Sequence, residues 1–277
     1  MVGYASRNLF CCLGYVGFSG DRTPYGMDCA ADFAGVLAQY LDIPLECMGQ
    51  PAEPSDVPWD AALGLSVPFF NRVSRRFHEL LSAKARPILV TPRCATSIAT
   101  LPVVNHYHPD VVVLWLDAHG DLNTPNTSPS GYLGGMPLAA GLGVWDSGYG
   151  AGLSGDRVIH IGGRDWDESE LEFIDSRSMT TLATMTTQKE LQQLASLIHG
   201  RNVYVHIDTD VYEPSEVVAE YAVADGLTRV DVATMLSAVL KCSTLIGLEI
   251  TELSPRNDAQ KASSYQALLD SFAPLNS

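Results

Sequence analysis

Five short apolar runs, rich in β-branched residues, recur along the chain and end at polar or glycine-containing turns. They are Pro87–Thr91, Val111–Leu116, Val158–Ile161, Val203–Ile207 and Leu245–Ile250. An uninterrupted apolar run of this length is typical of a strand that is covered on both faces. The runs therefore predict an α/β fold in which a central, mostly parallel sheet has helices on each side.

Stretches with helical character lie between these runs, which is the alternation that parallel sheets require. They are Phe70–Ala85, Ser169–Ile174, Thr187–His199 and Val230–Lys241, with a last one at about Ala259–Phe272. The segment Gly49–Pro58 is rich in proline and acidic residues and predicts a loop. The segment Gly131–Gly152 holds eight glycines and predicts flexible active-site loops.

The size and charge of the chain restrict the classes of partner. With 277 residues and 46% hydrophobic content, we expect one domain over residues 1–277. A net charge of −15 argues against nucleic acid or an anionic membrane and suits a small cationic substrate. The alternative is that the acidic surface only keeps the protein soluble. We expect a cytoplasmic protein, because no run approaches the roughly 18 apolar residues of a membrane span and no signal pattern opens the chain.

The cysteines give no sign of a disulfide framework or a zinc ribbon. Six are spread through the chain without CxxC spacing, and we expect most to be buried as small apolar side chains. They are Cys11, Cys12, Cys29, Cys47, Cys94 and Cys242.

The first cluster of polar residues follows the second apolar run. Asp117, His119 and Asp121 occupy alternate positions directly after it. At the carboxyl end of a parallel strand, such residues point into the crevice where open α/β sheets bind ligands. The alternative is a polar loop or a capping cluster.

Two further strand ends carry acidic residues. Asp208 and Asp210 follow the fourth run at alternate positions, and Glu252 follows the fifth. Two carboxylates on one side of a dry site repel each other unless a cation neutralises them. The alternative is a helix N-cap followed by an exposed acid. Several carboxylates and one imidazole form a hard, oxygen-rich site, which favours Mn²⁺, and bridging carboxylates imply two Mn²⁺ ions per chain.

These motifs, read with Asn123–Gly131 and Gly135-Met136-Pro137-Leu138, closely resemble the arginase and agmatinase (ureohydrolase) family over roughly Ile88 to Pro255. The resemblance implies the three-layer α/β/α arginase/deacetylase fold and a dinuclear manganese centre. It also implies that Asp117 and Asp208 bridge the ions. His119 and Asp210 would complete the ligands of one ion, and Asp121 would be a ligand of the other.

The same resemblance implies a small guanidino amino acid as substrate. Asn123, Ser128 and Ser130 fall in the segment that binds the α-carboxylate, and Asp167 matches the acid near the α-amino group. Glu252 matches the acid that faces the guanidinium. Asp121 would orient the attacking hydroxide. For Asn123 and Ser130 the alternative is ordinary turn chemistry.

Two departures from the family pattern concern Cys94 and Gly134. Cys94 falls where the family has a metal-binding His, and a thiolate can replace imidazole as a ligand. The alternative is an inert buried thiol beside a weak or absent ion. Gly134 falls where arginases carry a His that is thought to shuttle protons, and loss of a general acid usually costs about 10²–10⁴-fold in rate.

The departures favour an N-hydroxylated guanidine, which is less basic and therefore more often neutral. They resemble family members that cleave Nω-hydroxy-L-arginine to hydroxyurea and L-ornithine in D-cycloserine biosynthesis. The alternatives are an arginase or agmatinase acting on an unmodified guanidine, and a metal-poor binding or regulatory protein. We expect a monomer, because little chain follows Phe272. The sequence does not decide which residue replaces the missing His as general acid. The candidates are His78, His106, His108, His160, His199 and His206.

Overall fold

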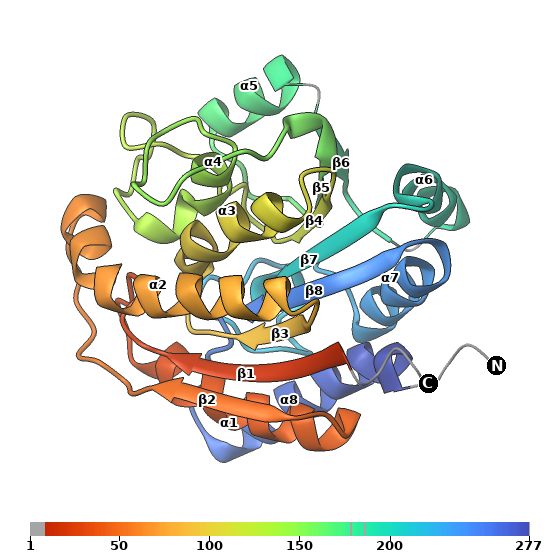
Figure 1. The fold of residues 1–277 in the computed structure, drawn as a ribbon, viewed down its shortest axis with the longest axis horizontal. Coiled ribbons are helices and arrows are strands. Elements are labelled where there is room, and N and C mark those ends of the chain that lie inside the picture. Colours follow the sequence, from red (N-terminus) through yellow and green to blue (C-terminus); the bar gives the residue numbers. More distant parts are fainter. Residues whose placement is uncertain (1–8, 178, 186, 277) are drawn as a thin grey trace.

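The computed structural model describes residues 9–177, 179–185 and 187–276, and Figure 1 shows its arrangement. Eight parallel strands form one sheet in the order β2-β1-β3-β8-β7-β4-β5-β6. The strands are β1 (Phe10–Val16), β2 (Leu45–Gly49), β3 (Arg86–Val90), β4 (Val112–Leu116), β5 (Val158–Ile161), β6 (Thr180–Leu182), β7 (Asn202–Asp208) and β8 (Thr244–Thr251).

Two layers of helices cover the sheet, and α2 and α3 cross in front of the strands in Figure 1. The helices are α1 (Tyr25–Leu41), α2 (Trp59–Ser82), α3 (Ser97–Tyr107), α4 (Pro137–Gly141), α5 (Glu168–Arg177), α6 (Gln188–Ile198), α7 (Arg229–Cys242) and α8 (Asp258–Phe272). The predicted α/β/α class with a parallel sheet is confirmed.

Alternate residues of the strands enter two separate apolar cores. In β4, Leu114 and Leu116 join the core beneath α1, α6, α7 and α8, whereas Val113 and Trp115 join the core beneath α2, α3 and α4. Side chains of successive strand residues point to opposite faces. This explains why the strands read as continuous apolar runs in the sequence.

The five predicted strands agree with the structure to within one residue at each end. Strands β1, β2 and β6 were not predicted, and neither were helices α1, α3 and α4. The helix predicted from Phe70 begins eleven residues earlier, at Trp59, because Pro68 is accommodated within it. The expected loop after Gly49 is present, but the glycine-rich segment contains α4 in its middle.

The cysteine prediction was right for only half of the set. Cys12, Cys29 and Cys94 are buried, Cys11 and Cys242 are partly buried, and Cys47 is exposed. Cys47 lies on the edge strand β2, where side chains alternate between partial burial and exposure.

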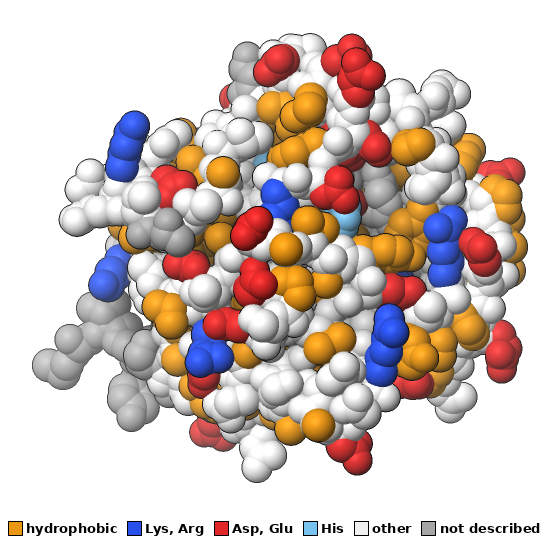
Figure 2. Space-filling view, turned by 180° about the vertical axis from the view of Figure 1, so that it is seen from behind, with side chains coloured by type: hydrophobic (Ala, Val, Ile, Leu, Met, Phe, Trp, Pro, Cys, Tyr) orange, Lys and Arg blue, Asp and Glu red, His pale blue; other side chains and the backbone are white. Residues whose placement is uncertain are grey.

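The surface carries the excess of acid that the composition predicts. On the face shown in Figure 2, Lys and Arg side chains stand apart from one another, and acidic side chains are more widespread. None of the helices in the described residues has the length and apolarity needed to cross a bilayer.

Candidate functional site

The order of the strands brings the predicted site residues together at one edge of the sheet. The four central neighbours are β3, β8, β7 and β4, and Leu116, Ile207, Ile250 and Val90 lie in register across them. The segments that follow these residues therefore leave the sheet at the same level. They carry Cys94, Glu252, the Asp208 and Asp210 pair, and the Asp117 to Asp121 motif.

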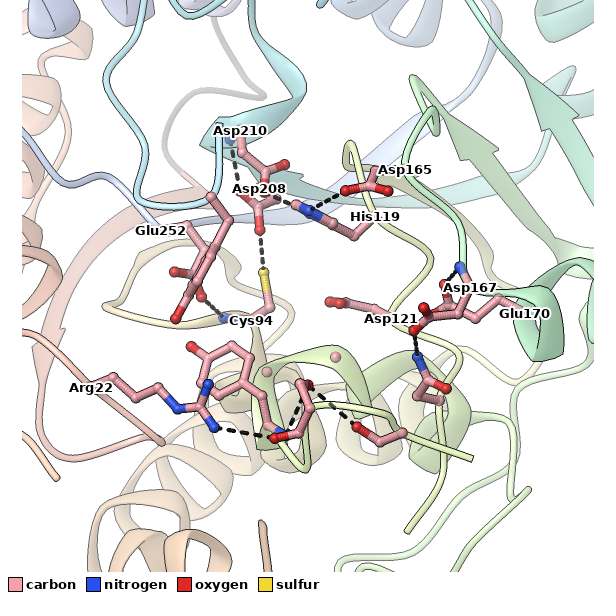
Figure 3. A pocket seen from close by; sticks show the side chains of 17 residues that line it. Arg22, Cys94, His119, Asp121, Asp165, Asp167, Glu170, Asp208, Asp210 and Glu252 are labelled. Atoms are coloured by element: carbon pink, nitrogen blue, oxygen red, sulfur yellow. Dashed lines mark hydrogen bonds and ion pairs between the residues drawn. The ribbon is translucent and has the colours of Figure 1, made fainter. Parts of the chain in front are cut away.

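A pocket opens over these strand ends, and Figure 3 shows the side chains that line it. The space between its atoms is about 800 Å³, including the part that is open to solvent, which is enough for a free amino acid. Its lining residues are Arg22, Cys94, His119, Asp121, Asn123, Ser128, Ser130, Tyr132, Gly134, Gly135, Asp165, Asp167, Glu170, Asp208, Asp210, Tyr221 and Glu252.

One group of possible metal ligands consists of Asp117, His119 and Asp210. His119 Nδ1 lies 2.9 Å from Asp210 Oδ2 and 3.6 Å from Asp117 Oδ1. Trp115 Nε1 donates to the second oxygen of Asp117 at 3.0 Å, and the backbone N–H of Ala118 donates to Asp210 at 3.0 Å. These outer contacts fix the carboxylates, and His119 itself lines the pocket.

The second group consists of Cys94, Asp208 and Glu252. The Cys94 thiol donates to Asp208 Oδ2 at 2.9 Å, and the backbone N–H of Cys94 donates to Glu252 Oε1 at 3.1 Å. Asp208 also accepts from the backbone N–H of Asp210 at 2.7 Å. This hydrogen bond connects the second group to the first, to which Asp210 belongs. Figure 3 shows Cys94 and Asp208 meeting in the centre of the pocket.

Asp121 extends towards the space between these groups in Figure 3. Its residue is 5% exposed, and Oδ2 has no hydrogen-bond partner in the described part of the chain. Asp121 and Glu252 also adopt the left-handed backbone region, with φ of 54° and 63°. This conformation is unfavourable for residues other than glycine and is found preferentially at functional sites.

The acids of the site raise one another's pKa. Burial, followed by repulsion from neighbouring carboxylates, holds the pKa values of Asp121 and Asp208 well above the usual range and also raises that of Asp117. Burial alone would lower the pKa of His119, but the hydrogen bonds that its ring donates to Asp117 and Asp210 raise it to about 12. Burial and Asp208 likewise raise the pKa of the Cys94 thiol. Such a cluster binds protons in place of cations, so its residues fit a divalent metal pair.

Residues at the other end of the pocket hold one another by neutral and charged hydrogen bonds. Asn123 Nδ2 donates to Asp167 Oδ2 at 2.7 Å. Glu170 accepts from the backbone N–H groups of Leu122 and Asp167, both at 3.0 Å. Ser128 is partly buried and Ser130 is exposed, and their hydroxyls lie 3.5 Å apart. The predicted substrate-binding residues Asn123, Ser128, Ser130, Asp167 and Glu252 therefore line one pocket.

Arg93 is a site residue that sequence reasoning gave no role. Its side chain is fully buried, and it forms ion pairs with Asp21, Glu220 and Glu252 at 3.0, 2.7 and 2.6 Å. Burial raises the pKa of Glu252 to about 7 even though Arg93 opposes that effect. The acid expected to face a substrate guanidinium thus already faces a guanidinium of the protein.

Tyr132 lies over the bare backbone of Gly134. A Cβ atom at Gly134 would stand 2.7 Å from Tyr132 Cζ and 3.0 Å from its Oη. The Tyr132 hydroxyl is buried, and none of the described residues offers it a hydrogen-bond partner. Arg93 could not be assigned from spacing, because its partners Asp21, Glu220 and Glu252 come from distant segments of the chain.

The six histidines considered as replacement acids do not line the pocket. His206 comes nearest. Its Nε2 lies 3.3 Å from Cys94 Sγ, its ring stacks on Trp115 at 3.5 Å, and its Nδ1 lies 2.8 Å from Glu249 Oε1. His206 therefore contacts the Cys94 thiol without lining the pocket itself. His160 contacts the backbone oxygen of His119, and His78 packs against His106 outside the pocket.

With this geometry established, the comparisons with known proteins define the family. Residues 38–270 match the Arginase family model. The chain is 36% identical over 255 residues to the N(omega)-hydroxy-L-arginine amidinohydrolase of Streptomyces lavendulae, covering 92% of each chain. It is 28% identical over 196 residues to the arginase of Bacillus caldovelox, covering 66% of each.

Solved structures agree on the fold. The arginase of Bacillus subtilis superposes with a TM-score of 0.83 at 22% identity, covering 96% of this chain and 98% of the other. The chain belongs to the arginase family and is a hydrolase that acts on guanidino compounds.

Proposed function

We propose that the protein is a dinuclear-manganese amidinohydrolase that cleaves Nω-hydroxy-L-arginine to hydroxyurea and L-ornithine. The observation that carries this proposal is the buried pair of Arg93 and Glu252, at 2.6 Å. A second guanidinium brought to Glu252 would meet the positive charge of Arg93 in a dry site. An N-hydroxyguanidine is less basic than a guanidine and can enter as the neutral form.

The two Mn²⁺ ions would be held by the six ligand-type side chains at the strand ends. When bound, they would supply Lewis acidity and lower the pKa of a water molecule towards neutrality. The buried and unpartnered oxygen of Asp121 supports this assignment, because an orphaned carboxylate oxygen is costly without a cation. The proposed ligands are Cys94, Asp117, His119, Asp121, Asp208 and Asp210.

The protein's own residues would orient the substrate along the pocket. Asn123 and Asp167, with Ser128 and Ser130, would hold the α-carboxylate and α-amino groups at one end. Glu252 would accept hydrogen bonds from the guanidino nitrogens at the other, using the lone pairs that Arg93 and the Cys94 N–H leave free. The reaction breaks the bond between the guanidino carbon and Nδ. Water supplies the oxygen to carbon and the proton to Nδ.

The relative from Streptomyces lavendulae supports this substrate, because its name specifies Nω-hydroxy-L-arginine and it matches 92% of the chain. We further propose that the reaction serves D-cycloserine biosynthesis, as the resemblance implied. The single catalytic domain over residues 1–277, the monomeric state and the cytoplasmic location stay predictions from the sequence.

The test is an assay of the purified, Mn²⁺-loaded protein with three substrates. We expect hydroxyurea release from Nω-hydroxy-L-arginine, with kcat/KM at least about 10-fold above that for L-arginine or agmatine, because a cation is disfavoured beside Arg93. Comparable turnover of L-arginine would instead identify an arginase. Turnover of none of them, with bound manganese near zero, would identify a binding protein.

A further inference from the structure

The Tyr132 hydroxyl is a buried donor in the wall of the pocket. No partner for it exists among the described residues, although a buried phenol normally finds one. The residue itself lines the pocket. A ligand in the pocket is therefore the partner that would satisfy this hydroxyl.

The ring of Tyr132 is held in place from several sides. Gly134 provides the floor, because any side chain there would overlap Cζ and Oη of the tyrosine. The guanidinium of Arg22 lies 4.7 Å from the ring centroid, and the ring of Tyr221 lies 5.5 Å away. The hydroxyl is thus positioned before a substrate arrives, which reduces the entropy lost on binding.

The charged neighbours of the phenol place it at the guanidino end of the pocket. Tyr132 lines the same pocket as Cys94 and Glu252. Burial and Glu252 raise the pKa of Tyr132 well above its ordinary value. The group is therefore a neutral donor of a hydrogen bond and a poor source of a proton, since its phenolate is disfavoured here.

We propose that Tyr132 is a specificity-determining catalytic residue whose hydroxyl donates a hydrogen bond to the N-hydroxyl oxygen of the substrate. This inference rests on the proposed function and deepens it. L-Arginine lacks that oxygen, so it leaves the buried hydroxyl unsatisfied. A site built around a polar group discriminates against an analogue that cannot pair with it. Tyr132 and Gly134 then act as one unit, in which the glycine makes room for the tyrosine ring.

The test compares Tyr132→Phe with the Mn²⁺-loaded wild type, and Tyr149→Phe serves as the matched control. Tyr149 donates to Asn71 at 3.1 Å outside the pocket. We expect Tyr132→Phe to lower kcat/KM for Nω-hydroxy-L-arginine about 10-fold and that for L-arginine less than about threefold. Calorimetry should show weaker binding of N-hydroxyguanidine, with binding of guanidine unchanged. Tyr149→Phe should match the wild type in every measurement.

Equal effects of Tyr132→Phe on both substrates, or none on either, would overturn the inference while leaving the proposed function intact. Near-UV circular dichroism and the unfolding midpoint would show that the variant is folded. A wild type that releases no hydroxyurea would overturn the proposed function and this inference together.

Discussion

Arg93 Nη1 lies 2.6 Å from Glu252 Oε2, and the two side chains are only 0% and 4% exposed. The contact places a permanent cation of the protein beside the acid that would otherwise receive the substrate's cation. Asp21 and Glu220 hold the same guanidinium, so it cannot swing aside without leaving other buried charges unpaired. The pair therefore sets the charge that a substrate must carry at this end of the pocket.

Replacing Arg93 should change both stability and substrate choice. Arg93→Gln leaves buried acids without their cation and should lower the free energy of unfolding by about 3–5 kcal/mol. It should also raise the ratio of kcat/KM for L-arginine to that for Nω-hydroxy-L-arginine about 10-fold, because Glu252 becomes free for a cation. Arg93→Lys keeps the charge and is the control. Denaturant unfolding and parallel assays of urea and hydroxyurea measure the effects, and an unchanged ratio in Arg93→Gln would contradict the argument.

Cys94 offers a test by metal content alone. If its thiolate is a ligand, Cys94→Ala should bind about one Mn²⁺ per chain where the wild type binds about two, and Cys94→His should restore the second. Cys47→Ala is the control, because Cys47 is exposed on the edge strand. Elemental analysis after gel filtration gives the stoichiometry. Two ions retained with undiminished affinity in Cys94→Ala would show that the thiol is inert.

Asp208 should destabilise the metal-free protein and stabilise the loaded one. Burial and repulsion from Asp210 and Asp117 raise its pKa well above the usual range. Asp208→Asn removes that charge but keeps an oxygen for the backbone N–H of Asp210. In chelator at pH 8, we expect it to be about 1–3 kcal/mol more stable than the wild type. Added Mn²⁺ should reverse the order. The exposed Asp110→Asn is the control, and a metal-free Asp208→Asn that melts below the wild type would refute the prediction.

The strands that could be predicted are those buried on both faces by β-branched residues. Strand β1 was missed because Cys11, Cys12 and Gly14 weaken its apolar pattern. Helix α3 was not predicted because Pro102 and the β-branched residues of this segment have low helix propensity. Tertiary packing against the sheet overrides these local preferences.

The site was predictable where acids follow strands directly, because parallel strands present their carboxyl ends at one edge of the sheet. The strand order then decided which ends meet, and no pattern in the sequence gives that order. The sequence indicated no role for Arg93, since its partners Asp21 and Glu252 lie 72 and 159 residues away along the chain. The same reason hid the contact between His206 and Cys94.

Glu170 should give the stability of the metal-free protein a measurable pH dependence. Burial raises its pKa from 4.5 to about 7. Because the pKa in the folded state lies above that in the unfolded state, the associated stabilisation is complete below pH 4.5 and is lost as pH rises through about 7, a change of about 3 kcal/mol. Glu170→Gln should abolish this part of the change. Unfolding midpoints between pH 5 and 8 compare the two proteins, and parallel curves would contradict the prediction.

Gly134→Ala tests whether Gly134 and the ring of Tyr132 act together, because this variant keeps the tyrosine and its hydroxyl. The new methyl would overlap Cζ of Tyr132, so the ring must turn away and take its hydroxyl out of position. Gly134→Ala should therefore reproduce the selective loss of activity of Tyr132→Phe. The double variant should lose no more than either single variant, because each removes the same hydrogen bond. Gly64→Ala is the control, since Gly64 lies in α2 outside the pocket and a Cβ there meets nothing within 4 Å. Additive losses in kcat/KM for Nω-hydroxy-L-arginine would show that Gly134 acts independently of Tyr132.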